Sequence, residues 1–277
     1  MNVEIENESL LVCFSSEGGA LTRIYDKEKK EEILYDGKGA WPFSDHILFP
    51  VIGANNSYSL NGHDYRLPKR HGFAWYSSFK ILSQTKESAS MLLERKEGEK
   101  QYPFPFRLEI SYVIDGRKLL RTGKVTPLSK DGLVFQYGLH PAFKANFSKA
   151  VLSVSKGTVL SLLDKGSGII QKEIPWPYPL SWRVLRNEIT SCDTLVIDNP
   201  TGKIMFDNGL GTKIELTSSC PYFALWTPEK ETEDDFLCVE SWYGISPYVR
   251  MDRDLSKRKA VNQIKKEKTF VDVLSFE

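Results

Sequence analysis

The residue types that could do chemistry in this chain are two histidines and two carboxylates, and His140 is the first of them. It lies in the run Phe135–Phe143 (FQYGLHPAF), where an alternating strand pattern stops in front of a proline. Proline disfavours helical geometry in the residue before it, so we expect His140 in extended backbone at a strand end. Because an imidazole titrates near neutral pH, His140 is a candidate general acid. The alternative is a purely structural histidine.

Glu240 is the second candidate. It lies in the run Cys238–Gly244 (CVESWYG), which is otherwise mostly apolar and aromatic. An unpaired charge is costly to bury, so this carboxylate needs a reason to be there. Burial raises the pKa of a glutamate toward the range of a general base. A structural ion pair with an arginine is the competing explanation.

His71 and Asp193 are candidates for holding a ligand. His71 is followed by Gly72, which lets the backbone approach a ligand closely. Asp193 precedes a predicted strand at 194–197, where its carboxylate could accept hydrogen bonds from substrate hydroxyls. An ordinary turn-forming aspartate is the alternative for Asp193.

Aromatic residues near these positions could complete a sugar site. Trp226 and Trp242 supply flat apolar faces of the kind that pack on the C–H surfaces of sugars. Aromatic residues at strand spacing are more often simple core, so these tryptophans alone decide nothing.

Other kinds of chemistry find little support in the sequence. The four histidines (His46, His63, His71 and His140) show no close pairing of the metal-ligand type, so we expect no metal. A glycine-rich phosphate loop, a nucleophile-elbow serine and a dinucleotide fingerprint are missing from the sequence, so we expect no cofactor. Acid–base chemistry remains.

Composition points to a cytoplasmic protein without nucleic-acid or membrane partners. The 37 Lys and Arg residues balance 36 Asp and Glu residues, and no block of like charge suggests a nucleic-acid-binding arm. No apolar run approaches the roughly 20 residues that span a bilayer, and residues 1–10 do not resemble a signal peptide. The four cysteines show no paired spacing, which favours buried thiols over disulfides.

Strand patterns recur along the whole chain. Asn61-Gly62, the strongest short hairpin signal, separates the predicted strands Ser57–Leu60 and Asp64–Leu67. Asp115-Gly116 separates Leu108–Ile114 from Lys118–Val125 in the same way. No long stretch has a 3.6-residue apolar period. We therefore predict an all-β fold, a large antiparallel β-sandwich, formed by residues 1–277 as a single domain.

Six segments of the chain carry a recognisable pattern: Leu48–Gly53, Arg70–Ala74, Tyr102–Phe106, Gly138–Phe143, Cys192–Leu195 and Val239–Gly244. In this order they resemble the aldose 1-epimerase (galactose mutarotase-like) family, in particular its LacX-like branch. The resemblance covers nearly the whole chain.

The resemblance implies a fold, a reaction and a set of roles. The fold is the galactose mutarotase-like supersandwich, here as a monomer or homodimer, and the partner is a small-molecule sugar. His140 corresponds to the general acid and Glu240 to the general base, while His71 and Asp193 correspond to residues that bind sugar hydroxyls. The implied reaction interconverts the α and β anomers of a hexose through the open-chain aldehyde.

The chain departs from the LacX-like pattern at three positions. Ala54 and Trp75 stand where relatives usually carry arginine, and Ser241 follows the glutamate where proline is common. Arginine donates several hydrogen bonds in a fixed fork, which alanine and tryptophan cannot imitate. We expect Trp75 to border the cleft. A catalytically weak carbohydrate-binding or sensing protein is therefore the alternative function, and a glycoside-cleaving enzyme, which would need two carboxylates, ranks third.

Overall fold

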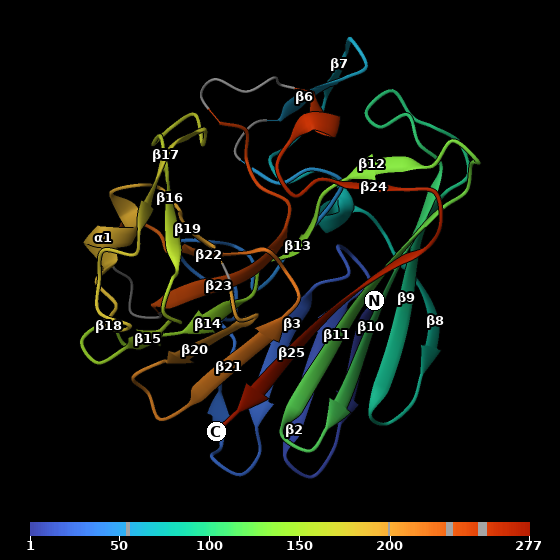
Figure 1. Cartoon of the computed structure of the whole chain (residues 1–277). Helices are drawn as coiled ribbons and strands as arrows, with labels where there is room; N and C mark the ends of the chain where they lie inside the picture. The colour runs from blue at the N-terminus through green and yellow to red at the C-terminus, as the bar shows by residue number, and fades with distance from the viewer. Residues whose placement is uncertain (54–55, 199, 231–234, 249–253) are drawn as a thin grey trace.

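The computed structural model describes residues 1–53, 56–198, 200–230, 235–248 and 254–277. Two large antiparallel sheets form most of the fold, and smaller sheets and hairpins pack around them (Figure 1). The predicted antiparallel β-sandwich is therefore confirmed.

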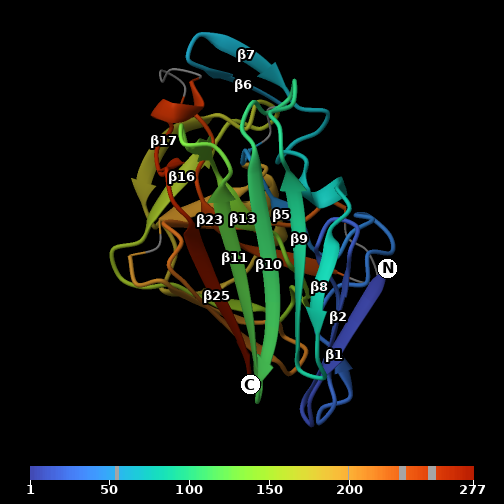
Figure 2. The ribbon, with the colours of Figure 1, turned by 90° about the vertical axis from the view of Figure 1, so that its right-hand side faces the viewer.

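The larger sheet has nine strands, and its long members run side by side in Figure 2. β10 alternates buried and more exposed residues along its length, as expected of a strand with one covered face. The predicted hairpin at Asp115-Gly116 joins β10 to β11, and Gly116 has a φ of 56°. In sheet order the strands are β18 (Ser181–Arg183), β15 (Val151–Ser153), β20 (Lys203–Asp207), β21 (Lys213–Ser218), β25 (Lys268–Phe276), β11 (Lys118–Pro127), β10 (Phe106–Asp115), β9 (Ser88–Arg95) and β8 (Lys80–Gln84).

The second sheet has eight strands and carries the candidate site. All eight residues of β23, at its centre, are buried, so this strand lacks the alternation of β10. In order the strands are β17 (Ile170–Pro175), β16 (Val159–Leu163), β19 (Leu195–Asp198), β22 (Tyr222–Trp226), β23 (Phe236–Tyr243), β13 (Tyr137–Leu139) and β5 (Ile47–Leu48), and β14 (Ala142–Lys144) also pairs with β23.

Smaller elements complete the fold. The predicted hairpin around Asn61-Gly62 is confirmed, with positive φ at both turn residues, as such a turn requires. The strands are β1 (Asn2–Glu6), β2 (Leu10–Ser15), β3 (Leu21–Asp26) and β4 (Glu31–Glu32) in one sheet, the hairpin of β6 (Ser57–Leu60) and β7 (His63–Arg66), and the pair β12 (Leu133–Phe135) and β24 (Asn262–Ile264).

Helical structure is limited to three short segments in the described residues, and none of them is predicted by the sequence patterns. They are α1 (Arg186–Thr190) and the 3₁₀ turns η1 (Ala74–Tyr76) and η2 (Leu255–Lys257). Segments of three to five residues are too short to display an apolar helical period. No helix in the described ranges is long and apolar enough to cross a membrane.

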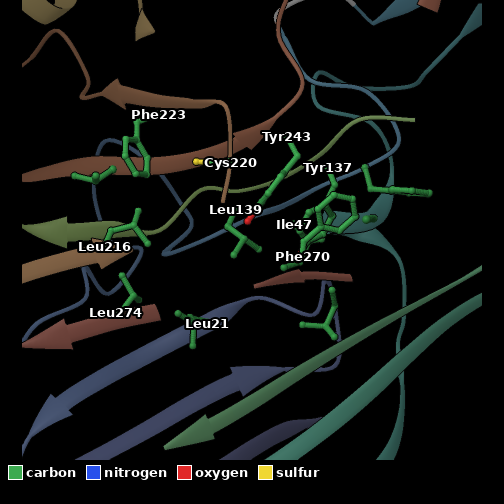
Figure 3. Packing of buried hydrophobic residues seen from close by; sticks show 14 of the residues in the cluster. Leu21, Ile47, Tyr137, Leu139, Leu216, Cys220, Phe223, Tyr243, Phe270 and Leu274 are labelled. Carbon is green, nitrogen blue, oxygen red and sulfur yellow. The ribbon is translucent and has the colours of Figure 1, made fainter. Parts of the chain in front are cut away.

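The core lies between the sheets and draws residues from nearly the full length of the chain. Figure 3 shows Tyr137 and Tyr243, from the eight-stranded sheet, beside Phe270 of β25. The ring of Phe270 lies 4.9 Å from that of Tyr137 and 4.6 Å from that of Tyr243. Cys220 and Cys238 are buried, as expected, whereas the thiols of Cys13 and Cys192 are only partly covered.

Candidate active site

A cavity of about 280 Å³ opens beside β23 and is large enough for a small molecule. All seven candidate residues from the sequence border it, although they are spread from His71 to Trp242 in the chain. The lining residues are Trp41, Phe43, His46, Arg70, His71, Trp75, His140, Asp193, Thr194, Trp226, Glu240 and Trp242.

Sheet pairing brings His140 and Glu240 together. The register that pairs Leu139 with Ser241 and Ala142 with Cys238 puts His140 directly opposite Glu240. Side chains of opposite residues in an antiparallel pair point to the same face of the sheet. Nε2 of His140 lies 3.2 Å from Oε1 of Glu240 at the cavity wall.

Burial controls the protonation of this pair. It raises the pKa of Glu240 well above its usual value, and the nearby carboxylates of Asp45 and Asp193 add to that rise. Burial likewise lowers the pKa of His140 well below its usual value, and His71 and His46 act in the same direction. Both groups thus favour their neutral forms, so one proton, shared across the 3.2 Å contact, belongs to the pair.

The other polar side-chain atoms of the pair are Oε2 of Glu240, which has a hydrogen-bond partner, and Nδ1 of His140, which has none in the described residues. Nε1 of Trp242 donates a hydrogen bond of 2.8 Å to Oε2 of Glu240 and fixes the plane of the carboxyl group. Nδ1 of His140 is buried and has no hydrogen-bond partner among the residues that the structure describes. Trp41 stacks on the His140 imidazole, with 5.1 Å between ring centroids.

His71 reaches the cavity through an unusual backbone conformation. It has a φ of 61°, and Gly72 after it has a φ of 84°. A side chain at position 72 would collide with the backbone of Phe49, so glycine is needed there. Nδ1 of His71 accepts a long hydrogen bond of 3.4 Å from the amide of Gly53. Burial lowers the pKa of His71 to about 4, and the neutral ring then carries its proton on Nε2.

Asp193 and the tryptophans line the other parts of the cavity. Asp193 precedes β19 in a left-handed conformation with a φ of 63°. Trp226 ends β22, and Trp242 lies on β23 two residues after Glu240. The described part of the chain therefore places polar and aromatic groups around one small space, as a sugar site requires.

Trp75, at a position where the resemblance implies arginine, borders the cavity. Its Nε1 donates to the carbonyl oxygen of Arg70, at 3.1 Å, so its one donor is used within the protein. The indole packs 4.4 Å from the His46 ring, and Nζ of Lys69 lies 4.7 Å above it. Trp75 thus offers the cavity an apolar face. Ala54, where the resemblance also implies arginine, lies outside the described residues.

Five lining residues were missed by the sequence interpretation: Trp41, Phe43, His46, Arg70 and Thr194. Arg70 and Thr194 are sequence neighbours of His71 and Asp193, so adjacency could have indicated them. The other three lie in 41–46, a stretch of the chain that forms no strand. Aromatic residues in such a stretch have no strand face to fill, which is the signal that was available.

His46 is the least expected member of the site. Its ring lies 5.9 Å from that of His140, and burial lowers its pKa to about 3, with His71 and Lys69 acting in the same direction. In the described residues, no group of three His, Cys, Asp or Glu side chains is arranged to hold a metal ion.

Comparison with known proteins finds relatives that match this chain over most of its length. LacX, the plasmid-encoded protein of Lactococcus lactis subsp. lactis, is 23% identical over 286 residues, which covers 95% of each chain. A galactose mutarotase related enzyme from Lactobacillus acidophilus has a TM-score of 0.91 at 22% identity and covers 100% of this chain and 97% of its own. A galactose mutarotase-like protein from Lactobacillus casei has the same TM-score at 19% identity, and both chains are covered completely.

At these identities the solved structures establish the fold, which is galactose mutarotase-like. The family itself is established by sequence, since residues 1–253 match the aldose 1-epimerase family along nearly the whole chain. This chain is a member of the aldose 1-epimerase family.

Proposed function

We propose that this protein is an active aldose 1-epimerase that interconverts the α and β anomers of a free hexose. The observation that carries the proposal is the 3.2 Å contact between Nε2 of His140 and Oε1 of Glu240 at the wall of the cavity. One acid and one base, sharing one proton, are what the reaction needs.

The reaction begins with the pair in its charged form, a carboxylate and an imidazolium. This form arises from the neutral pair when one proton moves from Glu240 to His140. Glu240 accepts the proton of the C1 hydroxyl, and His140 donates its proton to the ring oxygen. The bond between C1 and the ring oxygen breaks and the aldehyde forms. After rotation about the C1–C2 bond the ring closes with the roles reversed, and no proton is gained or lost overall.

The other lining residues supply binding. In this proposal, Nε2–H of His71 and the carboxylate of Asp193 hold sugar hydroxyls, while Trp226, Trp242 and Trp75 pack against the C–H faces of the ring. Hydrogen bonds to hydroxyl groups provide orientation, which brings C1 and the ring oxygen to the acid–base pair.

The direct test is polarimetry of freshly dissolved α-glucose and α-galactose. The expected result is equilibration faster than in buffer alone, with a rate proportional to protein concentration. The pH profile of kcat/KM should be bell-shaped, because a second proton on the pair inactivates it and so does loss of its only proton. A purified, folded protein that leaves the rate of both sugars unchanged would refute the proposal.

A weak carbohydrate-binding or sensing protein is the second candidate function, and Trp75 is the observation that favours it. Trp75 gives the cavity an apolar face at a position where a fork of donors is usual. Calorimetric titration separates the two functions. A binder without activity would take up hexoses and leave the polarimetric rate at that of buffer.

A further inference from the structure

A buried ion pair lies behind the acid–base pair. Asp45, just before β5, binds Arg121 of β11, and their side chains are 0% and 2% exposed. Arg121 belongs to the nine-stranded sheet, whereas Asp45 borders the eight-stranded sheet that carries the site. The ion pair therefore links the two layers underneath His140 and Glu240.

Asp45 also holds the backbone of His140. Its Oδ1 accepts a hydrogen bond of 3.2 Å from the amide of His140, and its Oδ2 accepts one of 3.0 Å from the amide of Leu21. The His140 amide also donates to the carbonyl oxygen of His46, at 3.0 Å. The chain continues from β13 to β14 along β23 through this residue, and Pro141 after it has no N–H for the sheet ladder.

Asp45 is linked to Glu240 through His140, because Asp45 accepts from the amide of His140 and the side chain of His140 contacts Glu240. The carboxylate of Asp45 contributes to the raised pKa of Glu240. Arg121 stays protonated, because Asp45 holds its pKa above the usual value against the effect of burial. Its guanidinium offsets the charge of Asp45 inside the fold. Asp45, Asp193 and Cys238 face Glu240, and His46 and His71 face His140.

We propose that Asp45 and Arg121 are positioning residues of the active site: Asp45 anchors the His140 backbone, and Arg121 binds Asp45 and balances its charge. The proposal rests on the proposed function for its kinetic part. A buried ion pair that served only to join the layers would not need the hydrogen bond from the His140 amide to Asp45.

The charge effect is tested by a readout that does not need activity. Because the indole N–H of Trp242 donates to Glu240, its NMR signal reports the ionisation of that carboxyl group. The chain has six tryptophans, and Trp242→Phe identifies the signal by its loss. The signal is followed against pH in the wild type, in Asp45→Asn and in the double variant Asp45→Asn/Arg121→Met.

Asp45→Asn leaves an uncompensated buried cation, which should move the titration of the Trp242 signal to lower pH by roughly one unit. The double variant has the same amide at position 45 without the cation, and the titration should return toward the wild-type pH. Equal titrations in the single and double variants would overturn the charge effect.

The anchoring of His140 by Asp45 is tested with two double variants, both of which lack the charges of residues 45 and 121. Asp45→Asn/Arg121→Met keeps an oxygen that can accept from the His140 amide, whereas Asp45→Ala/Arg121→Met does not. The alanine variant should have a kcat roughly 10- to 100-fold lower than the asparagine variant, with a smaller change in KM. Equal kcat values in the two folded proteins would overturn the anchoring.

Failure of the proposed function can be distinguished from failure of the positioning role of Asp45 and Arg121. A wild-type protein without mutarotase activity refutes the proposed function, and the Trp242 titration still decides the effect of Arg121. If Asp45→Asn does not fold because Arg121 is left unpaired, the two neutral double variants still decide the anchoring of His140.

Discussion

The two large sheets of this protein are built on different principles. Along β11, in the nine-stranded sheet, buried residues alternate with more exposed ones over most of the strand. Along β23, in the eight-stranded sheet, every residue is buried, including Glu240 and Ser241, each 1% exposed. Strand β11 thus has one face toward the core, and strand β23 is covered on both faces.

This difference decides what a polar residue in each strand indicates about function. Polar groups on the open face of a strand such as β11 can point to water at little cost, so they indicate nothing about function. Polar groups in a strand covered on both faces must be compensated or used, because burying them is costly. Glu240 is compensated by its contacts with Trp242 and His140. It also borders the cavity, where the proposed reaction uses it.

The largest effect should come from matched substitutions of a glutamate in each sheet. Glu240→Gln keeps the size of the side chain and removes the base, so kcat should fall by roughly 10²- to 10⁴-fold. Glu109→Gln on β10, where Glu109 lies 3.5 Å from Lys124, should leave kcat unchanged. Polarimetry measures both. A Glu240→Gln protein as fast as the wild type would remove Glu240 from the mechanism.

The second prediction concerns the nine-stranded sheet, where a core substitution should change stability and leave activity nearly unchanged. Ile110, on β10, is 0% exposed, and Ile110→Ala should lower the free energy of unfolding by about 2–5 kcal/mol. Activity per folded molecule should change little, because the residue belongs to the other sheet. Urea unfolding and polarimetry on the same sample provide the measurements. A large loss of activity in the folded protein would show that core packing around β10 also supports the active site.

The third prediction concerns the dependence of stability on pH. The unfolded chain protonates His46 near pH 6.5, whereas the folded protein does so only near pH 3. His46 therefore lowers the free energy of unfolding as the pH falls below 6.5, by about 2–3 kcal/mol at pH 4.5.

His46→Gln should remove that part of the acid sensitivity. Urea unfolding at pH 7 and pH 4.5 measures it, with His63→Gln on the exposed β6–β7 hairpin as the control. If His46→Gln and the wild type lose equal stability between the two pH values, His46 is not held neutral by burial.

The smallest effect should come from Trp75, at the rim of the cavity. Trp75→Ala removes the face that packs on His46 and, in the proposed complex, on the sugar. A stacking contact contributes about 0.5–1.5 kcal/mol, so KM should rise by roughly 2- to 10-fold, more than kcat falls. Trp75→Phe keeps an aromatic face and should have an intermediate KM. The same KM for the alanine variant and the wild type would show that Trp75 does not contact the sugar.

Much of the fold could be predicted from local patterns. The Asn61-Gly62 and Asp115-Gly116 turns mark hairpins because these residues adopt positive φ at low cost, and alternating residues mark the strands on either side. The types of the candidate site residues were also visible, since a histidine before proline and a glutamate in an apolar run are both unusual. The short helix α1 was missed, because five residues carry no helical period.

Only the tertiary structure brings the candidate site residues into contact. His140 and Glu240 are far apart in sequence and become neighbours only because β13 and β14 pair with β23 in one register. A shift of that register by one residue would turn one of the two side chains to the other face. Local propensity does not specify which distant strands pair, so neither the 3.2 Å contact nor the Asp45–Arg121 ion pair beneath it could be read from the chain. The sequence determined which chemical groups are present, and the packing of the two sheets determined which of them act together.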